Sequence, residues 1–333
     1  MNRRRMIAAV IGGIISVALL VLMVRGLALH ELIDALALVS LPILVLSLLS
    51  RGFGFVFMAL RTRALLGEDA DMMMLIKSHL AGFAGNNLLP FRLGELVRID
   101  WQARGTGLPR SHLLATAGIE RLLDLCVLFS FFVVITPLAI GEIPRAEALG
   151  VLGAMLVVAP LTMLVVVKHS ESFLRLIELM LRPLGEGASV FILERTAAFF
   201  DGLSALSSPK RVIAAMLVSL GYWSMTLVSI QVWITAFGLD LEWYAPFFVT
   251  GFLAFGAAIP SAPGFVGTWH YLCRTALVSL GVLEATAVAF AFVGHFMAVV
   301  PFTLVSVLWL GGGGLASGFK SLKSNSTEGE QDE

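Results

Sequence analysis

Glycine, asparagine and proline interrupt an apolar segment at Phe83-Ala-Gly-Asn-Asn-Leu-Leu-Pro90-Phe-Arg92-Leu-Gly94-Glu95. A second interruption occurs late in the chain, at Phe255-Gly-Ala-Ala-Ile-Pro260-Ser-Ala-Pro263-Gly-Phe-Val-Gly267-Thr268. In each stretch a Phe and a run of small residues precede a Pro, and a Gly follows that Pro four positions later. Proline lacks the backbone N–H and clashes with the preceding turn, so neither stretch forms an unbroken helix. Paired interruptions in the two halves of a hydrophobic chain are typical of a transporter's binding site.

The composition is that of an integral membrane protein. Hydrophobic residues make up 58% of the 333 residues and charged residues only 14%, against about 25% charge in soluble domains. The net charge of zero excludes a general basic surface for nucleic acid. The two cysteines, Cys126 and Cys273, match no metal or redox spacing. We therefore expect neither a cofactor nor a metal.

The hydropathy pattern predicts an all-α fold, a polytopic transmembrane helical bundle. Each predicted full span is close to the ~20 residues that cross a bilayer. The six full spans are 6–24, 38–60, 119–140, 148–167, 211–237 and 286–310.

The two interrupted segments, 72–104 and 247–282, predict re-entrant or broken-helix hairpins. Their order among the spans makes them enter from opposite faces of the membrane, which favours an inverted repeat. Residues 1–318 then form one transmembrane domain. Within it, 172–206 read as amphipathic helices on the cytoplasmic surface, and the polar segment 319–333 reads as a disordered cytoplasmic tail.

Lys and Arg fall mainly on one side of this arrangement, which places both termini in the cytoplasm by the positive-inside rule. We interpret Arg61 and Arg63, directly after the second predicted span, as two of these cytoplasmic anchors. The others are Arg3, Arg4, Arg5, Lys168, Arg175, Arg182, Arg195, Lys210, Arg211, Lys320 and Lys323.

Charged residues around the first interruption are the leading candidates for a binding site, because such groups are costly within a membrane. Arg92, Glu95 and Arg98 are spaced by three residues and share one face of a helix. Asn86 and Asn87 add amide donors before the break. Guanidinium groups and a helix N-terminus can hold a phosphate. The alternative is that both arginines are membrane anchors, with Glu95 as their partner.

Further charges lie elsewhere in apolar segments. Glu120 and Asp124, beside Arg121, are one helical turn apart and could balance Arg92 or Arg98, or form a structural ion network. The remaining candidates lie in the second predicted span and around the late interruption. They are Arg51, Pro263, Gly264, Gly267 and Arg274.

One pattern points to an enzyme instead. Asp69-Ala-Asp71 is a D-x-D pair that could hold a metal-bound nucleotide sugar, and Glu95 could assist it. This pattern is common in polar loops. It keeps open an integral-membrane transferase that acts on a lipid-linked substrate.

Three motifs resemble one known family. They are Gly82-Phe-Ala-Gly-Asn-Asn-Leu-Leu-Pro-Phe-Arg-Leu-Gly-Glu-Leu-Val-Arg98, Ile119-Glu-Arg-Leu-Leu-Asp124 and Ile259-Pro-Ser-Ala-Pro-Gly-Phe-Val-Gly267. In this order they are similar to the lysylphosphatidylglycerol synthase transmembrane family, also called flippase-like domain proteins, over about 6–315. Family members often have Pro-Gly-Gly in the third motif, where this chain has Phe265 in place of the second glycine.

The resemblance implies a protein of the bacterial inner membrane that moves a polar or anionic phospholipid, or another lipid phosphate, between leaflets. No synthase domain follows residue 320 in this sequence, so we do not expect aminoacyl transfer. The alternatives are the transferase and a non-catalytic partner of a separate envelope-lipid enzyme. The chain could also assemble as an oligomer.

Overall fold

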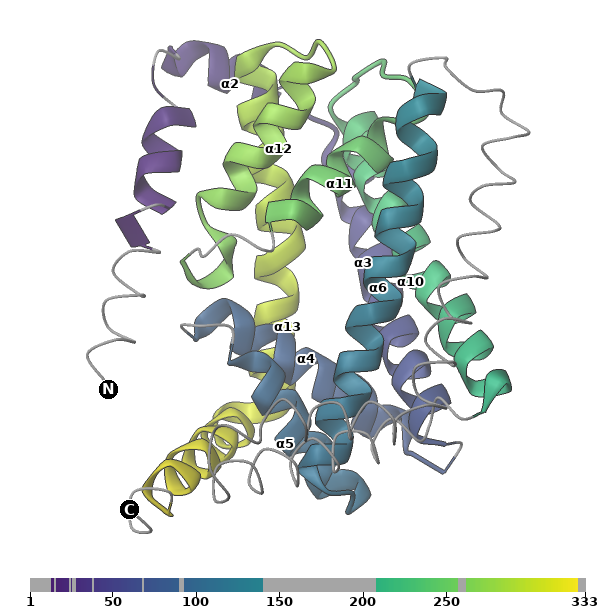
Figure 1. The fold of residues 1–333 in the computed structure, drawn as a ribbon. Helices are drawn as coiled ribbons and strands as arrows, with labels where there is room; N and C mark the ends of the chain where they lie inside the picture. The colour runs from purple at the N-terminus through teal and green to yellow at the C-terminus, as the bar shows by residue number, and fades with distance from the viewer. Residues whose placement is uncertain are drawn as a thin grey trace, which may run out of the picture. The chain divides into compact units, whose positions relative to one another are not determined.

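The computed structural model describes residues 13–14, 16–23, 25, 28–37, 39–67, 69–89, 93–139, 208–256 and 262–328. Within these ranges every regular element is a helix and none is a strand (Figure 1). The all-α prediction is therefore confirmed for the described part of the chain. The predicted span 148–167 and the predicted amphipathic helices at 172–206 lie outside it.

Three described helices are long and apolar enough to cross a membrane. They are α3 (Leu41–Leu66), α10 (Pro209–Ala236) and the first part of α13, Glu284–Trp309. They correspond to the predicted spans 38–60, 211–237 and 286–310. The predicted span 119–140 lies in α6 (Arg110–Ala139), which begins earlier than predicted. Of the predicted first span, residues 13–14 and 16–23 are described, and they are helical.

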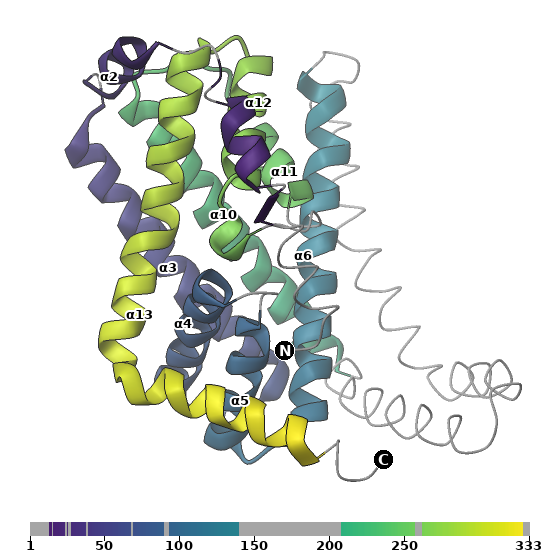
Figure 2. The ribbon, with the colours of Figure 1, turned by 90° about the vertical axis from the view of Figure 1, so that its left-hand side faces the viewer.

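The last helix, α13 (Glu284–Glu328), continues well beyond its membrane-spanning part. Its 45 residues would measure about 68 Å if straight, more than twice the ~30 Å hydrocarbon core. Figure 2 shows that the helix changes direction along its length. Residues 319–328 are helical, which differs from the disordered tail predicted there. They contain neither Gly nor Pro, and extending an existing helix is much easier than starting one.

Both interrupted segments fold as pairs of short helices, as predicted. The first consists of α4 (Met72–Leu88) and α5 (Gly94–Thr106). The second consists of α11 (Ala245–Gly256), the 3-10 turn η4 (Pro263–Phe265) and α12 (Thr268–Ser279). Helices of 12 or 13 residues are only about 18–20 Å long, too short to cross the hydrocarbon core alone.

The chain divides into two compact units. Unit 1 comprises Met1–Phe55, His79–Arg98 and Trp223–Glu333, and unit 2 comprises Val56–Ser78 and Ile99–Tyr222. Helices α3, α4, α5 and α10 each contribute residues to both units.

Unit 1 is organised around the membrane-spanning part of α13. Helix α12 packs against both α13 and α11. The short helix α2 (Leu29–Ala37), which the sequence analysis did not identify, also packs against α13. Trp233 and Phe290 are fully buried among aliphatic side chains and form the centre of this core. These contacts hold the second interrupted segment in place.

Unit 2 brings together parts of α3, α6 and α10. Ile99, Leu113 and Ala117 form a small buried cluster, against which Leu66 packs. Helices α3 and α10 approach closely at Gly221, where an added Cβ would lie 2.3 Å from the Phe57 ring. The absence of a side chain at this position therefore permits the contact.

Candidate functional site

The backbone of the second interruption adopts conformations that favour glycine. Gly264 has φ 69° and Gly267 has φ 88°, both in the left-handed region. Gly267 directly precedes α12, and an added Cβ there would lie 2.3 Å from the Ser16 carbonyl oxygen. Phe265 also has a positive φ, of 60°, although this region is unfavourable for a residue with a side chain.

Two histidines hold this interruption through hydrogen bonds. The His295 Nε2 group lies 2.7 Å from the Gly264 carbonyl oxygen, which can only accept, so Nε2 carries the proton. The His270 Nδ1 atom accepts from the Gly267 N–H at 3.2 Å and caps the start of α12. The two imidazole rings lie 4.4 Å apart, measured between centroids. The turn is thereby fixed by neutral polar groups.

Close helix packing at glycine residues holds the described part of the first interruption together. A Cβ added to Gly94 would lie 1.9 Å from the Gly82 carbonyl oxygen, and one added to Gly85 would lie 2.7 Å from the Gly94 Cα. The end of α4 and the start of α5 therefore touch backbone to backbone. The Asn86 side chain lies at this contact, and its Oδ1 is buried without a hydrogen-bond partner among the described residues.

The two interruptions meet within unit 1. A Cβ added to Gly264 would lie 3.6 Å from the Asn87 carbonyl oxygen. The Asn87 side chain donates from Nδ2 to the Thr303 hydroxyl on α13 at 3.0 Å. Asn87, Gly264 and Gly267, which the sequence analysis selected separately, thus belong to one contiguous region, which we call the junction. Pro263 begins the turn that carries Gly264.

The first described cation after the first interruption, Arg98, is buried. The Arg98 side chain is 3% exposed and forms an ion pair with Glu95, whose side chain is 32% exposed. Both residues lie on α5 in unit 1, directly after the contact between Gly82 and Gly94. Arg92 lies outside the described residues. The predicted pairing of Glu95 with an arginine is therefore present for Arg98.

Two other predicted cations of unit 1 have different surroundings. Arg51 is half-buried in α3. Arg274 forms an ion pair with Glu284 across the turn between α12 and α13. The Arg274 side chain is thus held at one end of these helices.

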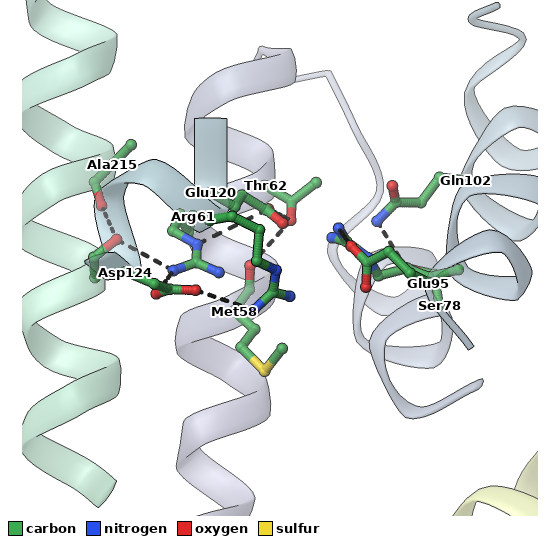
Figure 3. Close-up of polar contacts among 12 residues, drawn as sticks. Met58, Arg61, Thr62, Ser78, Glu95, Gln102, Glu120, Asp124 and Ala215 are labelled. Carbon is green, nitrogen blue, oxygen red and sulfur yellow. Dashed lines mark hydrogen bonds and ion pairs between the residues drawn. The ribbon is translucent and has the colours of Figure 1, made fainter. Parts of the chain in front are cut away.

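The pair Glu120 and Asp124 belongs to unit 2, where it surrounds Arg61 (Figure 3). The Arg61 Nη1 atom lies 2.5 Å from the Asp124 carboxylate, and its Nε atom lies 3.9 Å from that of Glu120. All three side chains are almost completely buried. Arg121 contacts the same Asp124 carboxylate at 3.2 Å. The structure therefore supplies Arg61 as a buried counter-ion for this pair, a partner that the sequence analysis did not name.

Arg61 is the main residue that the sequence analysis misassigned. It was interpreted as a cytoplasmic anchor beyond the second span, but α3 continues to Leu66 and buries Arg61 at 1% exposure. The available signal was the pair of carboxylates one turn apart on α6, which needs a cation nearby.

Asp100 was also missed. It is buried between Arg104 and Arg110, which both form ion pairs with its carboxylate.

The pattern that suggested an enzyme has a structural explanation at one of its two residues. The Asp71 carboxylate accepts a hydrogen bond from the Met74 N–H at 2.6 Å. Asp71 therefore caps the N-terminus of α4. Among the residues that the structure describes, no three His, Cys, Asp or Glu side chains gather as a metal site.

Comparison with known proteins identifies the family. No curated protein and no solved structure matches the chain significantly. The family model for the lysylphosphatidylglycerol synthase TM region matches residues 9–306, which include both interruptions and the Arg61 cluster. This match confirms the resemblance found from the three sequence motifs. The chain is a multi-pass helical membrane protein, and it belongs to the lysylphosphatidylglycerol synthase TM region family, which is linked to lipid metabolism or transport.

Proposed function

We propose that this protein moves a polar or anionic phospholipid between the two leaflets of the bacterial inner membrane, with both of its termini in the cytoplasm. The observation that carries the proposal is the junction, where the two interruptions touch beside Asn87 and Gly264. Irregular backbone at membrane depth is tolerated where protein buries it or where it lines a polar cavity. Broken helices of this kind bind the substrate in many transporters.

The polar groups near the junction suit a phosphate headgroup. Arg98 is a buried cation on α5, and a guanidinium can grip two phosphate oxygens at once. Asn86 belongs to α4, and its polar side chain lies beside Gly94 at the start of α5. The backbone N–H groups at a helix N-terminus favour an anion. In the proposal Arg98 exchanges its partner Glu95 for the phosphate, Arg92 assists, and the acyl chains remain in the bilayer.

The proposal extends to the protein's partners. A phospholipid or another lipid phosphate is the substrate, and a separate lipid-modifying enzyme supplies it. An oligomer is compatible with the large apolar surface of the helices, which is otherwise covered by lipid. The pair α4 and α5 contacts the pair α11 and α12 through the backbone at Gly264. In the proposal one pair moves against the other at this contact without repacking of large side chains.

A transport assay tests the proposal. The purified protein is placed in liposomes with phosphatidylglycerol that carries a fluorophore on one acyl chain, and a membrane-impermeant reductant quenches the outer leaflet. We expect the protein to accelerate loss of the protected fluorescence. Arg98→Gln should reduce the protein-dependent rate by about tenfold or more, because a hydrogen bond between charged groups contributes about 1.5–3 kcal/mol.

Two control variants separate binding from structure. Arg104→Gln removes an arginine from the same helix, but one whose side chain is 47% exposed and paired with Asp100; it should keep most of the rate. The double variant Arg98→Gln, Glu95→Gln removes the whole ion pair. If the pair is purely structural, this double variant regains transport, and the assignment of Arg98 to the phosphate is wrong. If the wild-type protein moves no lipid, the transport proposal itself fails.

A further inference from the structure

Two buried histidines beside the second interruption each use only one of their ring nitrogens. His270 on α12 is 4% exposed and His295 on α13 is 8% exposed. One nitrogen of each ring is bonded to the backbone of the interruption, at Gly267 and Gly264. Within the part of the chain that the structure describes, the other two nitrogens, His270 Nε2 and His295 Nδ1, have no hydrogen-bond partner. Buried polar groups almost always have one, so these two atoms are suited to a bound molecule.

The backbone hydrogen bonds fix where the ring protons lie. His270 Nδ1 accepts from the Gly267 N–H at 3.2 Å, so in the neutral ring the hydrogen lies on Nε2. His295 Nε2 donates to the Gly264 carbonyl oxygen at 2.7 Å, so in the neutral ring Nδ1 has the lone pair. The two unused nitrogens are therefore one donor, on His270, and one acceptor, on His295.

The two imidazole rings are adjacent and neutral. Their centroids lie 4.4 Å apart, and the Trp269 and Phe292 rings pack against them. Among the described residues, no carboxylate forms an ion pair with either histidine. A buried charge without a partner is costly, and such a group becomes neutral instead. The pair therefore offers hydrogen bonds rather than charge.

One donor beside one acceptor discriminates between the polar groups of lipid headgroups. A phosphate oxygen only accepts, so it would meet the lone pair of His295, and an ammonium group only donates, so it would meet the N–H of His270. A metal ion needs a lone pair from each ring, but that of His270 already binds the Gly267 N–H. A hydroxyl group both donates and accepts, and it can satisfy both nitrogens at once.

We propose that His270 and His295 bind a hydroxyl group of the lipid headgroup. The hydroxyl donates its hydrogen to His295 Nδ1 and accepts the hydrogen of His270 Nε2, and no covalent bond changes. This inference rests on the proposed transport function, for which it names the substrate class: a phospholipid whose headgroup carries a hydroxyl group. The location supports it, because His295 binds the carbonyl group of Gly264, which lies beside Asn87 at the junction.

Two lipids that differ only in their hydroxyl groups test the proposal. Phosphatidylpropanol has the phosphate and the negative charge of phosphatidylglycerol, but a propyl group replaces its glycerol headgroup. Both lipids carry the same fluorophore on one acyl chain and are compared at the same low density in the liposome assay. We expect the protein to move phosphatidylglycerol about tenfold faster, because phosphatidylpropanol leaves both buried nitrogens without a partner.

Glutamine variants test each histidine separately. In His270→Gln the amide can still accept from the Gly267 N–H, and in His295→Gln it can still donate to the Gly264 carbonyl oxygen, but the second ring nitrogen is lost. Each variant should lower the ratio of the two transport rates to about threefold or less. The matched control is His112→Gln on α6, in unit 2, which should keep the wild-type ratio. A ratio that neither His270→Gln nor His295→Gln changes would overturn the proposal.

Nitrogen NMR of the wild-type protein tests the site without any substitution in the measured sample. The protein contains isotope-labelled histidine and is placed in nanodiscs of either lipid, and the His295 signal is assigned by its loss in His295→Gln. The resonance of an unprotonated ring nitrogen moves when that nitrogen accepts a hydrogen bond. We expect the His295 Nδ1 signal to differ between the two lipids. An identical signal in both would mean that no headgroup hydroxyl binds the pair, and the proposal would be wrong.

Together the two experiments separate this inference from the proposed function. If both lipids move at the same rate and the His295 signal is the same in both, the hydroxyl site is wrong while transport stands. If the signal differs between the lipids but neither lipid moves, the transport function fails and the hydroxyl site stands.

Discussion

The two interrupted segments have the same architecture but are held together by different interactions. The first, between α4 and α5, depends on backbone contact at Gly82, Gly85 and Gly94, and a buried charge follows it at Arg98. The second, between α11 and α12, is fixed by hydrogen bonds from His270 and His295. Similar breaks in a helix can thus serve different purposes. A buried ion pair, Arg98 with Glu95, follows the first break, whereas hydrogen bonds from two histidines fix the second.

The largest effect is expected where a side chain would meet backbone. Gly94→Ala places a Cβ 1.9 Å from the Gly82 oxygen, and Gly267→Ala places one 2.3 Å from the Ser16 oxygen. Neither oxygen belongs to a flexible side chain that could move away. We therefore expect each substitution to lower the free energy of unfolding by about 4 kcal/mol or more. Gly52→Ala on α3, with only an ordinary contact at 3.9 Å, is the control. Thermal unfolding in detergent, monitored by size-exclusion chromatography, compares the stability of these variants with that of the control. A Gly94→Ala protein as stable as the control would contradict the backbone contact.

The second interruption should depend strongly on its histidines. His295→Phe preserves a ring but leaves the Gly264 carbonyl oxygen without its hydrogen-bond donor. We therefore expect the free energy of unfolding to fall by about 1–3 kcal/mol. His295→Gln, which can still donate, should lose less. The measurement is the free energy of unfolding in lipid–detergent micelles. Equal losses in the two variants would show that ring packing, rather than the hydrogen bond, holds the turn.

The contact between the first interruption and α13 predicts a coupled pair. Asn87→Ala and Thr303→Val each remove one side of a hydrogen bond of 3.0 Å. In a double-mutant cycle on unfolding, we expect a coupling energy of about 0.5–1.5 kcal/mol. Additive effects of the two substitutions would mean that this contact contributes nothing to stability.

The smallest effect concerns the left-handed residue in the second interruption. Phe265→Gly should be more stable than Phe265→Ala by about 1 kcal/mol, because both variants lose the ring but only glycine accepts φ 60° without penalty. At the next residue, Val266, φ is −56°. There we expect the opposite order, with the Ala variant more stable than the Gly variant. The same order at both positions would contradict the backbone conformation of Phe265.

Local sequence patterns were sufficient to predict most of the described fold. Apolar length identified α3, α10 and the spanning part of α13. Proline and glycine correctly located both interruptions, because their effect on the backbone is local. The predicted inverted repeat stays a prediction, since it depends on how segments far apart in the chain are arranged.

The candidate site was harder to predict because it depends on long-range contacts. The sequence singled out Asn87 and Gly264, but only the fold brings them together. Arg61 was interpreted as an anchor because it follows the predicted end of an apolar run, whereas Asp124 of α6 and Ser219 of α10 bind its buried guanidinium group. A charged residue at the predicted end of a span can therefore be a buried partner when carboxylates occur on another helix.

Photochemical crosslinking at the junction tests the central claim most directly. A diazirine-bearing residue is introduced in place of Asn87, and in a separate variant in place of its exposed neighbour Leu88. After illumination in native membranes, mass spectrometry of the labelled peptide shows which part of a phospholipid is attached. The account predicts attachment to the headgroup at position 87 and to acyl chains at position 88. Attachment to acyl chains alone at both positions, or to protein alone at position 87, would contradict a lipid headgroup at the junction.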